Sequence, residues 1–327
     1  MTKEIFASYR DFYRHQLLDD CIPFWEHSDL LDRKFGGYIT SVDREGKSYN
    51  DDKSVWFQGR CLWTFSALMN RYGKKAAWEE GAEIGKGFLE KFCTDTDGRM
   101  FFTVTRDGRP LRKRRYMFSE SFYVVSMAEY AAATGDAEAL RKAEECFELM
   151  LRLYRTPESD PYKITPKTYA STRADRASAV PMVLVSSAQL LRRCDPAKAD
   201  YYTKVTNEMV DAIIDYHYKP SAMRAECVGR TASSRQSGGR CVNPAFDGEL
   251  VFLMNEAIYS GNKALLEKAL NILDWSLELG WDKGRRLHLL HRHRRPPCSS
   301  EWDMAGGSTT RRYRHVPRLT GEEIFDV

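Results

Sequence analysis

Residues 53–63, Lys53-Ser-Val-Trp-Phe-Gln-Gly-Arg-Cys-Leu-Trp63, open an apolar stretch that continues through Met69. The pattern predicts an α-helix on which Trp56, Arg60 and Trp63 share one face, because they are spaced four and three residues apart. One interpretation is a surface arginine whose stem covers a core aromatic ring. The other is the wall of a pocket, where the rings pack on a flat ligand and the guanidinium binds hydroxyls or an oxyanion. The rest of the chain favours the pocket wall.

Turns recur along the chain at intervals of 60 to 65 residues, each between an apolar helical pattern and a more charged one. They fall at Gly73, Gly135, Pro196, Gly261 and Gly321. A repeated helical hairpin must bury its apolar face against its neighbours. We therefore expect an all-α chain, an (α/α)6-type barrel with two concentric rings of helices, in one domain over residues 1–327; an open solenoid is the alternative. Six pairs at this spacing would need roughly 370 residues, so we expect the last pair to be missing.

Composition places the chain among ordinary globular proteins. Its 327 residues are 43% hydrophobic and carry a net charge of +4, which is too small to indicate a nucleic-acid partner. No apolar run approaches the ~18 residues of a membrane-spanning helix, and the N-terminus lacks the apolar core of a secretory signal. The eight cysteines show no Cys-x-x-Cys spacing, which predicts reduced thiols in a cytoplasmic protein.

Five stretches resemble, in order and at the repeat spacing, the N-acylglucosamine 2-epimerase superfamily, which also contains cellobiose 2-epimerases and aldose–ketose isomerases. They are the Trp56–Trp63 helix, Phe118-Ser-Glu-Ser-Phe-Tyr, Pro181-Met182, Asn243-Pro244 with Glu249, and Glu301-Trp-Asp303. The resemblance implies an (α/α)6 barrel. It also implies a carbohydrate epimerase or isomerase that moves a proton at C2 of a sugar through an enediolate, without a cofactor or a metal.

The same resemblance implies roles for individual residues. Arg60 would stabilise the negative oxygen of the enediolate, and Glu249 would bind sugar hydroxyls or orient the catalytic base. Trp56, Phe118 and Trp302 would line the sugar site. The implied partner is a small-molecule sugar, with no nucleic acid and no membrane. An incomplete ring of helices would leave apolar flanks exposed, which favours a homodimer.

The chain departs from the family pattern at both catalytic histidines. Phe246 stands where the resemblance implies the base, and residues 304–312 replace the stretch that should lead towards the second histidine. One alternative is therefore a catalytically inactive sugar-binding member of the same fold. Another is an (α/α)-barrel glycoside hydrolase, which would need two carboxylates roughly 5 to 10 Å apart. Glu120, Glu249 and Asp303 are its candidates.

A shift of the reading frame is a further hypothesis for these departures. Synonymous codons for residues 245–252, shifted by one base, spell His-Ser-Met-Glu-Ser-Trp-Phe and restore a His-x-x-Glu motif. Similar shifts restore family-like sequence at 287–295 and at 304–312. The hypothesis predicts that the native protein carries the histidine and a longer C-terminal part.

Four of the seven histidines lie in the last 40 residues, at His288, His291, His293 and His315. With Cys298, they offer a metal site as an alternative interpretation. We do not expect a metal there, because no carboxylate is adjacent and neighbouring arginines would oppose a cation. A basic patch for nucleic acid or anionic lipid is equally weak, since no aromatic residues are interleaved to stack on bases.

Overall fold

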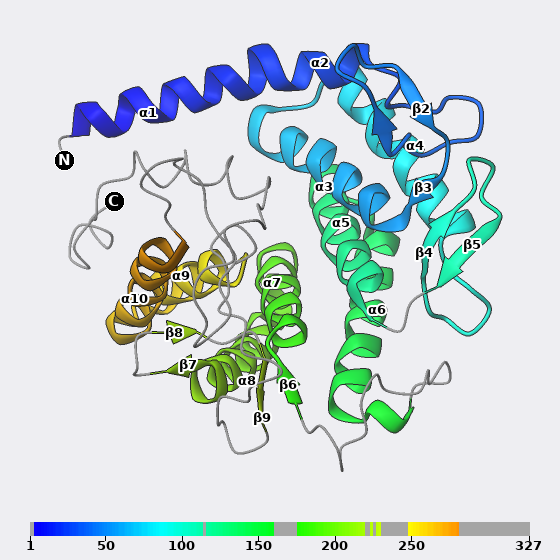
Figure 1. The fold of residues 1–327 in the computed structure, drawn as a ribbon. Coiled ribbons are helices and arrows are strands. Elements are labelled where there is room, and N and C mark those ends of the chain that lie inside the picture. Colours follow the sequence, from blue (N-terminus) through cyan, green and yellow to red (C-terminus); the bar gives the residue numbers. More distant parts are fainter. Residues whose placement is uncertain are drawn as a thin grey trace. The chain divides into compact units, whose positions relative to one another are not determined.

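The computed structural model describes residues 3–113, 116–159, 175–219, 223–224, 227–229 and 248–280. The chain divides into two compact units, one of residues 1–164 with 190–199 and the other of 165–189 with 200–327. Helices make up most of the described chain in both units (Figure 1), as the all-α prediction requires. The single domain that we expect from the repeat stays a prediction.

The helices of the first unit follow the predicted pattern of hairpins. Their bounds are α1 Lys3–His15, η1 Gln16–Cys21, α2 Ile22–His27, α3 Val55–Tyr72, α4 Ala76–Phe92, α5 Phe118–Thr134, α6 Ala137–Arg155 and η2 Pro157–Ser159. Gly73 and Gly135 end α3 and α5 at the predicted turns. Their φ angles are 87° and 79°, a conformation that glycine adopts without a Cβ clash.

The N-terminal helix runs further than the sequence indicates. The pattern predicts an end near Cys21, but helical backbone continues through η1, a π-helix, into α2. Pro23 does not break it, because it lies in the first turn of α2, where the backbone N–H is not required. The helix ends at Ser28, whose backbone is extended.

Short antiparallel strands connect the helices of the first unit. β1 Ser41–Val42 pairs with β2 Ser48–Asn50, so this hairpin lies a few residues later than the 35–46 region in which the glycines predict it. β3 Lys53–Ser54, β4 Phe101–Val104 and β5 Pro110–Lys113 form a sheet in the order β3-β4-β5. Because β3 leads directly into α3, the start of α3 lies beside the β4–β5 hairpin.

The apolar helices α3 and α5 pack directly against each other, and α4 and α6 each cover one of them. Gly59 permits the close approach of α3 and α5. A Cβ at Gly59 would lie 2.8 Å from both the Cβ and the carbonyl oxygen of Phe122. The pattern predicts an apolar face of α4 formed by Trp78, Ala82, Phe88, Leu89 and Phe92. The first four are buried in the core, and Phe92 is half-buried. The alternation of an apolar and a more charged helix is the one that the sequence repeat predicts.

Lys53, the first residue of the 53–63 stretch, is fully buried beneath α3. Its Nζ donates to Asp32 Oδ2 at 2.9 Å and to the carbonyl oxygens of Gly36 and Arg106 at 2.5 and 2.9 Å. It also lies 4.3 Å from the centre of the Phe88 ring. Lys53 therefore ties the Gly36 loop and the β4–β5 connection to the start of α3.

Gln58 holds the same loop from inside α3. Its Oε1 accepts from the Tyr38 N–H at 2.7 Å, and its Nε2 donates to the Tyr38 carbonyl at 2.7 Å. The Gln58 side chain thus pairs the Tyr38 backbone as a neighbouring strand would, and Tyr38 also forms an isolated antiparallel bridge with Leu31. In the motif Lys-x-x-Trp-x-Gln-x-Arg, the lysine and the glutamine are buried and structural, whereas the tryptophan is half-buried and the arginine is exposed.

The remaining elements continue the alternation of helices. They are β6 Asp175–Ala177, α7 Ala179–Cys194, η3 Pro196–Lys198, α8 Ala199–His217, β7 Tyr218–Lys219, β8 Met223–Arg224, β9 Cys227–Gly229, α9 Gly248–Ser260 and α10 Lys263–Gly280. α9 and α10 form a hairpin around Gly261, whose φ is 67°. Gln189 of α7 donates to the Phe252 carbonyl and to Glu256 of α9 at 2.9 and 3.1 Å.

The described cysteine side chains carry free thiols. They are Cys21, Cys61, Cys93, Cys146 and Cys194. Within the described residues, every helix is too short or too polar to span a lipid bilayer.

Candidate functional site

Arg60 lies on an exposed part of α3 and stacks on a ring from the neighbouring helix. Its guanidinium carbon is 4.3 Å from the centre of the Phe122 ring. Partial burial lowers the pKa of Arg60 from its ordinary value, but no carboxylate is paired with it among the described residues. Arg60 is therefore a positioned cation whose charge remains available to a ligand.

Trp56, one turn before Arg60, is the centre of an aromatic cluster. Its ring centre lies 5.1 Å from that of Phe102, 5.3 Å from that of Phe118 and 5.8 Å from that of Phe122. The Phe102 contact is edge-to-face, an arrangement that aromatic rings prefer, and the other two contacts are tilted. The structure thus brings the predicted residues Trp56 and Phe118 into contact. It adds Phe102 of β4 and Phe122 of α5, which were not predicted.

The pattern that pointed to Arg60 is only partly realised. The sequence places the arginine between two tryptophans, but its ring partner is Phe122, and Trp63 remains 41% exposed. A signal for Phe122 was present, since it follows Phe118 by four residues and shares its helix face. The contact of Phe122 with Arg60 depends on the close approach of α3 and α5 at Gly59, which the sequence pattern does not predict.

Glu120, a candidate acid of the hydrolase alternative, has a structural role. It is fully buried, and its Oε1 accepts from Arg99 Nε at 2.7 Å and from the Met100 N–H at 3.0 Å. Arg99 is itself 1% exposed. This buried ion pair fastens the start of β4 to α5, so Glu120 does not offer an open carboxylate to a substrate.

The structure gives no distance between Arg60 and the other predicted site residues, because their side chains lie outside the described residues. Glu249 lies in the first turn of α9, in the second unit, and its side chain is outside the described residues. Trp302, Phe246, Asp303 and the histidines from His288 onward also lie outside them. Among the described residues, no group of three histidine, cysteine or acidic side chains could hold a metal ion.

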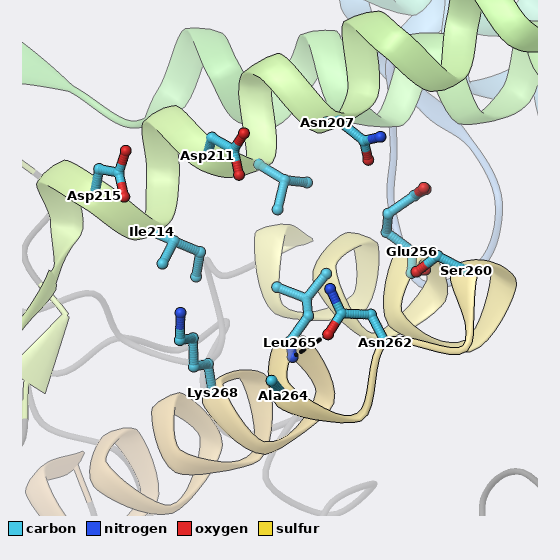
Figure 2. Close-up of a pocket in the computed structure, with 11 residues that line it drawn as sticks. Asn207, Asp211, Ile214, Asp215, Glu256, Ser260, Asn262, Ala264, Leu265 and Lys268 are labelled. Atoms are coloured by element: carbon cyan, nitrogen blue, oxygen red, sulfur yellow. Dashed lines mark hydrogen bonds between the residues drawn. The ribbon is translucent and has the colours of Figure 1, made fainter.

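A groove of about 640 Å³ lies within the second unit, between α8, the end of α9 and the start of α10 (Figure 2). Asp211 and Asp215 line it from α8, and Lys268 lines it from α10. The Asn262 side chain accepts from the Leu265 N–H at 3.0 Å and so caps α10. None of the predicted site residues lines this groove. No sequence motif points to this groove, because acids four residues apart on a charged helix are typical of a solvated face.

Solved structures with the same arrangement of helices identify the class of fold. The cellobiose 2-epimerase of Bacillus thermoamylovorans matches with a TM-score of 0.72 at 20% identity, over 86% of this chain and 75% of that one. Such proteins are (α/α)6 barrels of paired helices, and the fold class predicted from the repeat is confirmed.

The sequence identifies the family within this class. The sequence model of the N-acylglucosamine 2-epimerases matches residues 37–300. The N-acylglucosamine 2-epimerase of Mus musculus is 30% identical over 302 residues, which cover 88% of this chain and 70% of that one. The enzyme of Homo sapiens is 29% identical over 275 residues, which cover 82% of this chain and 63% of that one. The chain belongs to the N-acylglucosamine 2-epimerase family and spans 63% to 70% of the length of these relatives.

The family confirms the predicted class of protein, an isomerase that acts on carbohydrates. The hydrolase alternative is not favoured. Small-molecule sugars are the substrates of this family, as predicted.

Proposed function

We propose that this chain is a sugar 2-epimerase that acts on an N-acylglucosamine-type sugar and that Arg60 and Glu249 are its catalytic residues. The observation that carries the proposal is the Arg60 guanidinium, which lies over Phe122 beside the Trp56 cluster without a carboxylate partner among the described residues. An arginine neutralised by a carboxylate would have no charge left for an intermediate. This one does.

The chemistry needs such a cation. Once the sugar ring is open, a base removes the proton at C2, and the electron pair of the C–H bond moves into an enediolate. The guanidinium stabilises the negative oxygen that forms. Return of the proton to the opposite face of C2 gives the epimer, and its return to the neighbouring carbon gives the ketose. Trp56, Phe118 and Trp302 would hold the sugar, and Glu249 would bind hydroxyls or orient the base.

The same proposal includes the cofactor requirement, the location and the oligomeric state of the enzyme. Proton transfer within the sugar involves no net oxidation or reduction, so it requires no nicotinamide. The Arg60 guanidinium would supply the positive charge that a metal ion could otherwise supply to the enediolate oxygen. The free thiols support a cytoplasmic location. The apolar face of α1 supports a homodimer, because Ile5, Phe12 and Tyr13 are 43%, 56% and 40% exposed.

Proton exchange with solvent tests the epimerase. N-acetylmannosamine and N-acetylglucosamine in D₂O should each gain deuterium at C2, which NMR detects. Arg60→Ala should lower the rate about 100-fold or more, since one stabilising donor at an oxyanion contributes that much. Arg71→Ala, an exposed arginine near the end of the same helix, is the control. Equal exchange in Arg60→Ala and in the unaltered chain would contradict the role of Arg60.

A second candidate is a protein that binds the sugar without turning it over. Phe246 favours it, because phenylalanine cannot accept a proton where the family resemblance implies a histidine. Calorimetry of the same two sugars separates the candidates. Binding that depends on Arg60, together with no deuterium at C2, would identify the binding protein.

A further inference from the structure

Among the residues that the structure describes, the cations of the β4–β5 hairpin and its flanks are paired with carboxylates, except Arg112. The pairs join Arg99 to Glu120, Arg106 to Asp32 and Asp51, Arg109 to Asp107, and Lys113 to Asp95 and Asp97. Arg112 of β5 has no carboxylate partner within the part of the chain that the structure describes. It is exposed, and it lies between residues whose charges are neutralised.

Arg112 instead lies over a ring of the candidate site. Its guanidinium carbon is 5.6 Å from the centre of the Phe102 ring. Phe102 in turn packs edge-to-face on Trp56, with ring centres 5.1 Å apart. The antiparallel pairing of β4 and β5 fixes this position, because Arg112 lies opposite Thr103 in the register.

The aromatic cluster is therefore flanked by two guanidinium groups, neither of which has a carboxylate partner in the described part of the chain. Arg60 joins it through Phe122, and Arg112 joins it through Phe102. The enediolate of a neutral sugar occupies only one cation. A second unneutralised guanidinium beside the same rings suits a second negative group on the ligand, and its fork of donors matches the oxygens of a phosphate.

We propose that Arg112 is a specificity-determining residue that binds a phosphate ester on the sugar, so that the substrate class is a phosphorylated amino sugar or hexose. The inference rests on the proposed function, since it assigns the sugar to the Trp56 cluster. Arg60 then serves the reacting end of the substrate, and Arg112 serves its phosphate.

Calorimetry with three probes tests the proposal: N-acetylmannosamine, N-acetylmannosamine 6-phosphate and inorganic phosphate. The unaltered chain should bind the 6-phosphate about tenfold more tightly than the neutral sugar, as one charge-assisted contact at an exposed site provides. Arg112→Gln should abolish this preference and leave the affinity for the neutral sugar unchanged. Arg109→Gln is the matched control, because Arg109 lies on the same hairpin but is paired with Asp107.

The outcomes separate this proposal from the epimerase itself. Equal affinity for both sugars in the unaltered chain, or a preference that survives in Arg112→Gln, would overturn the role of Arg112 while neutral-sugar binding still supports the sugar site. Inorganic phosphate that binds as tightly as the 6-phosphate would reduce Arg112 to a general anion contact and also overturn it. If neither sugar binds, the sugar site and the phosphate contact are both wrong.

Discussion

At the scale of single residues, the contact between Arg60 and Phe122 determines where the candidate cation lies. Phe122→Leu keeps an apolar side chain but removes the ring face, while Phe122→Tyr keeps the face. A cation–π contact contributes about 0.5 to 2 kcal/mol. We therefore expect sugar binding to weaken between about twofold and thirtyfold in Phe122→Leu, by calorimetry, and to change little in Phe122→Tyr.

The double variant shows whether Phe122 acts through Arg60. If it does, adding Phe122→Leu to Arg60→Ala should cost no further affinity, because the group that the ring positions is gone. Additive losses would mean that the ring contacts the sugar itself or that the leucine disturbs the fold.

A second prediction at this scale concerns the buried pair of Lys53 and Asp32. Asp32→Asn removes the carboxylate and leaves a fully buried ammonium with only carbonyl partners. Breaking a buried pair in this way costs about 3 to 5 kcal/mol, and urea unfolding should show such a loss in the free energy of unfolding. Glu80→Gln is the control, because the pair of Glu80 and Arg33 is exposed and should contribute less than about 1 kcal/mol. Similar losses in both variants would contradict this difference.

The same carboxylate makes stability depend on acid pH. Burial opposes the ionisation of Asp32, but hydrogen bonds from Arg106 and Lys53 outweigh it and lower the pKa from 3.8 to about 2. A pKa lowered in the folded state gives stability that is present above pH ~4 and is lost as the pH falls towards 2. Burial lowers the pKa of Lys53, but the Lys53 ammonium loses its proton only at alkaline pH, so it does not contribute to the change in stability at acid pH. The free energy of unfolding between pH 5 and 2.5 should therefore fall less steeply in Asp32→Asn; an unchanged slope would exclude Asp32 as the cause.

At the scale of helices, Gly59 controls the distance between α3 and α5. Gly59→Ala would place a Cβ 2.8 Å from the backbone oxygen of Phe122, so the two helices must separate. We expect a loss of about 1 to 3 kcal/mol in the free energy of unfolding. Gly87→Ala on α4 is the matched control, since no atom lies within 4 Å of its added Cβ. It should stabilise the chain by up to about 1 kcal/mol. Gains in both variants would show that α3 and α5 can move apart freely.

The elements also show what the sequence can predict. Helical periodicity and the glycine turns predict α3 to α6 well, because both signals are local. The pairing of β3 with β4 joins Ser54 to Thr103, which are far apart in the chain, and no local pattern encodes it. The roles of Phe102 and Phe122 depend on that pairing and on the close helix approach. The sequence therefore predicted Trp56, Phe118 and Arg60 but not the rings that position them.

At the scale of the whole molecule, the predicted site draws on both units. Arg60 belongs to the first unit, and Glu249 belongs to the second. The prediction that Arg60 and Glu249 share one site comes only from the resemblance to a family whose fold closes into a barrel. Family membership is shown, but the joint site of Arg60, Glu249 and Trp302 remains a prediction that proton exchange in Glu249→Gln would test. We expect Glu249→Gln to lose proton exchange at C2. Unchanged exchange would remove Glu249 from the site.

The last prediction concerns the base, without which the epimerase cannot work. The frame-shift hypothesis predicts that peptides from the native protein have the mass of His-Ser-Met-Glu-Ser-Trp-Phe in place of residues 245–252. That protein should then exchange the C2 proton, because a histidine can accept it. Masses that fit Ala245-Phe-Asp-Gly-Glu-Leu instead would mean that Phe246 is genuine. The family fold would then hold a sugar at Arg60 without removing its proton, and calorimetry would show binding where NMR shows no deuterium.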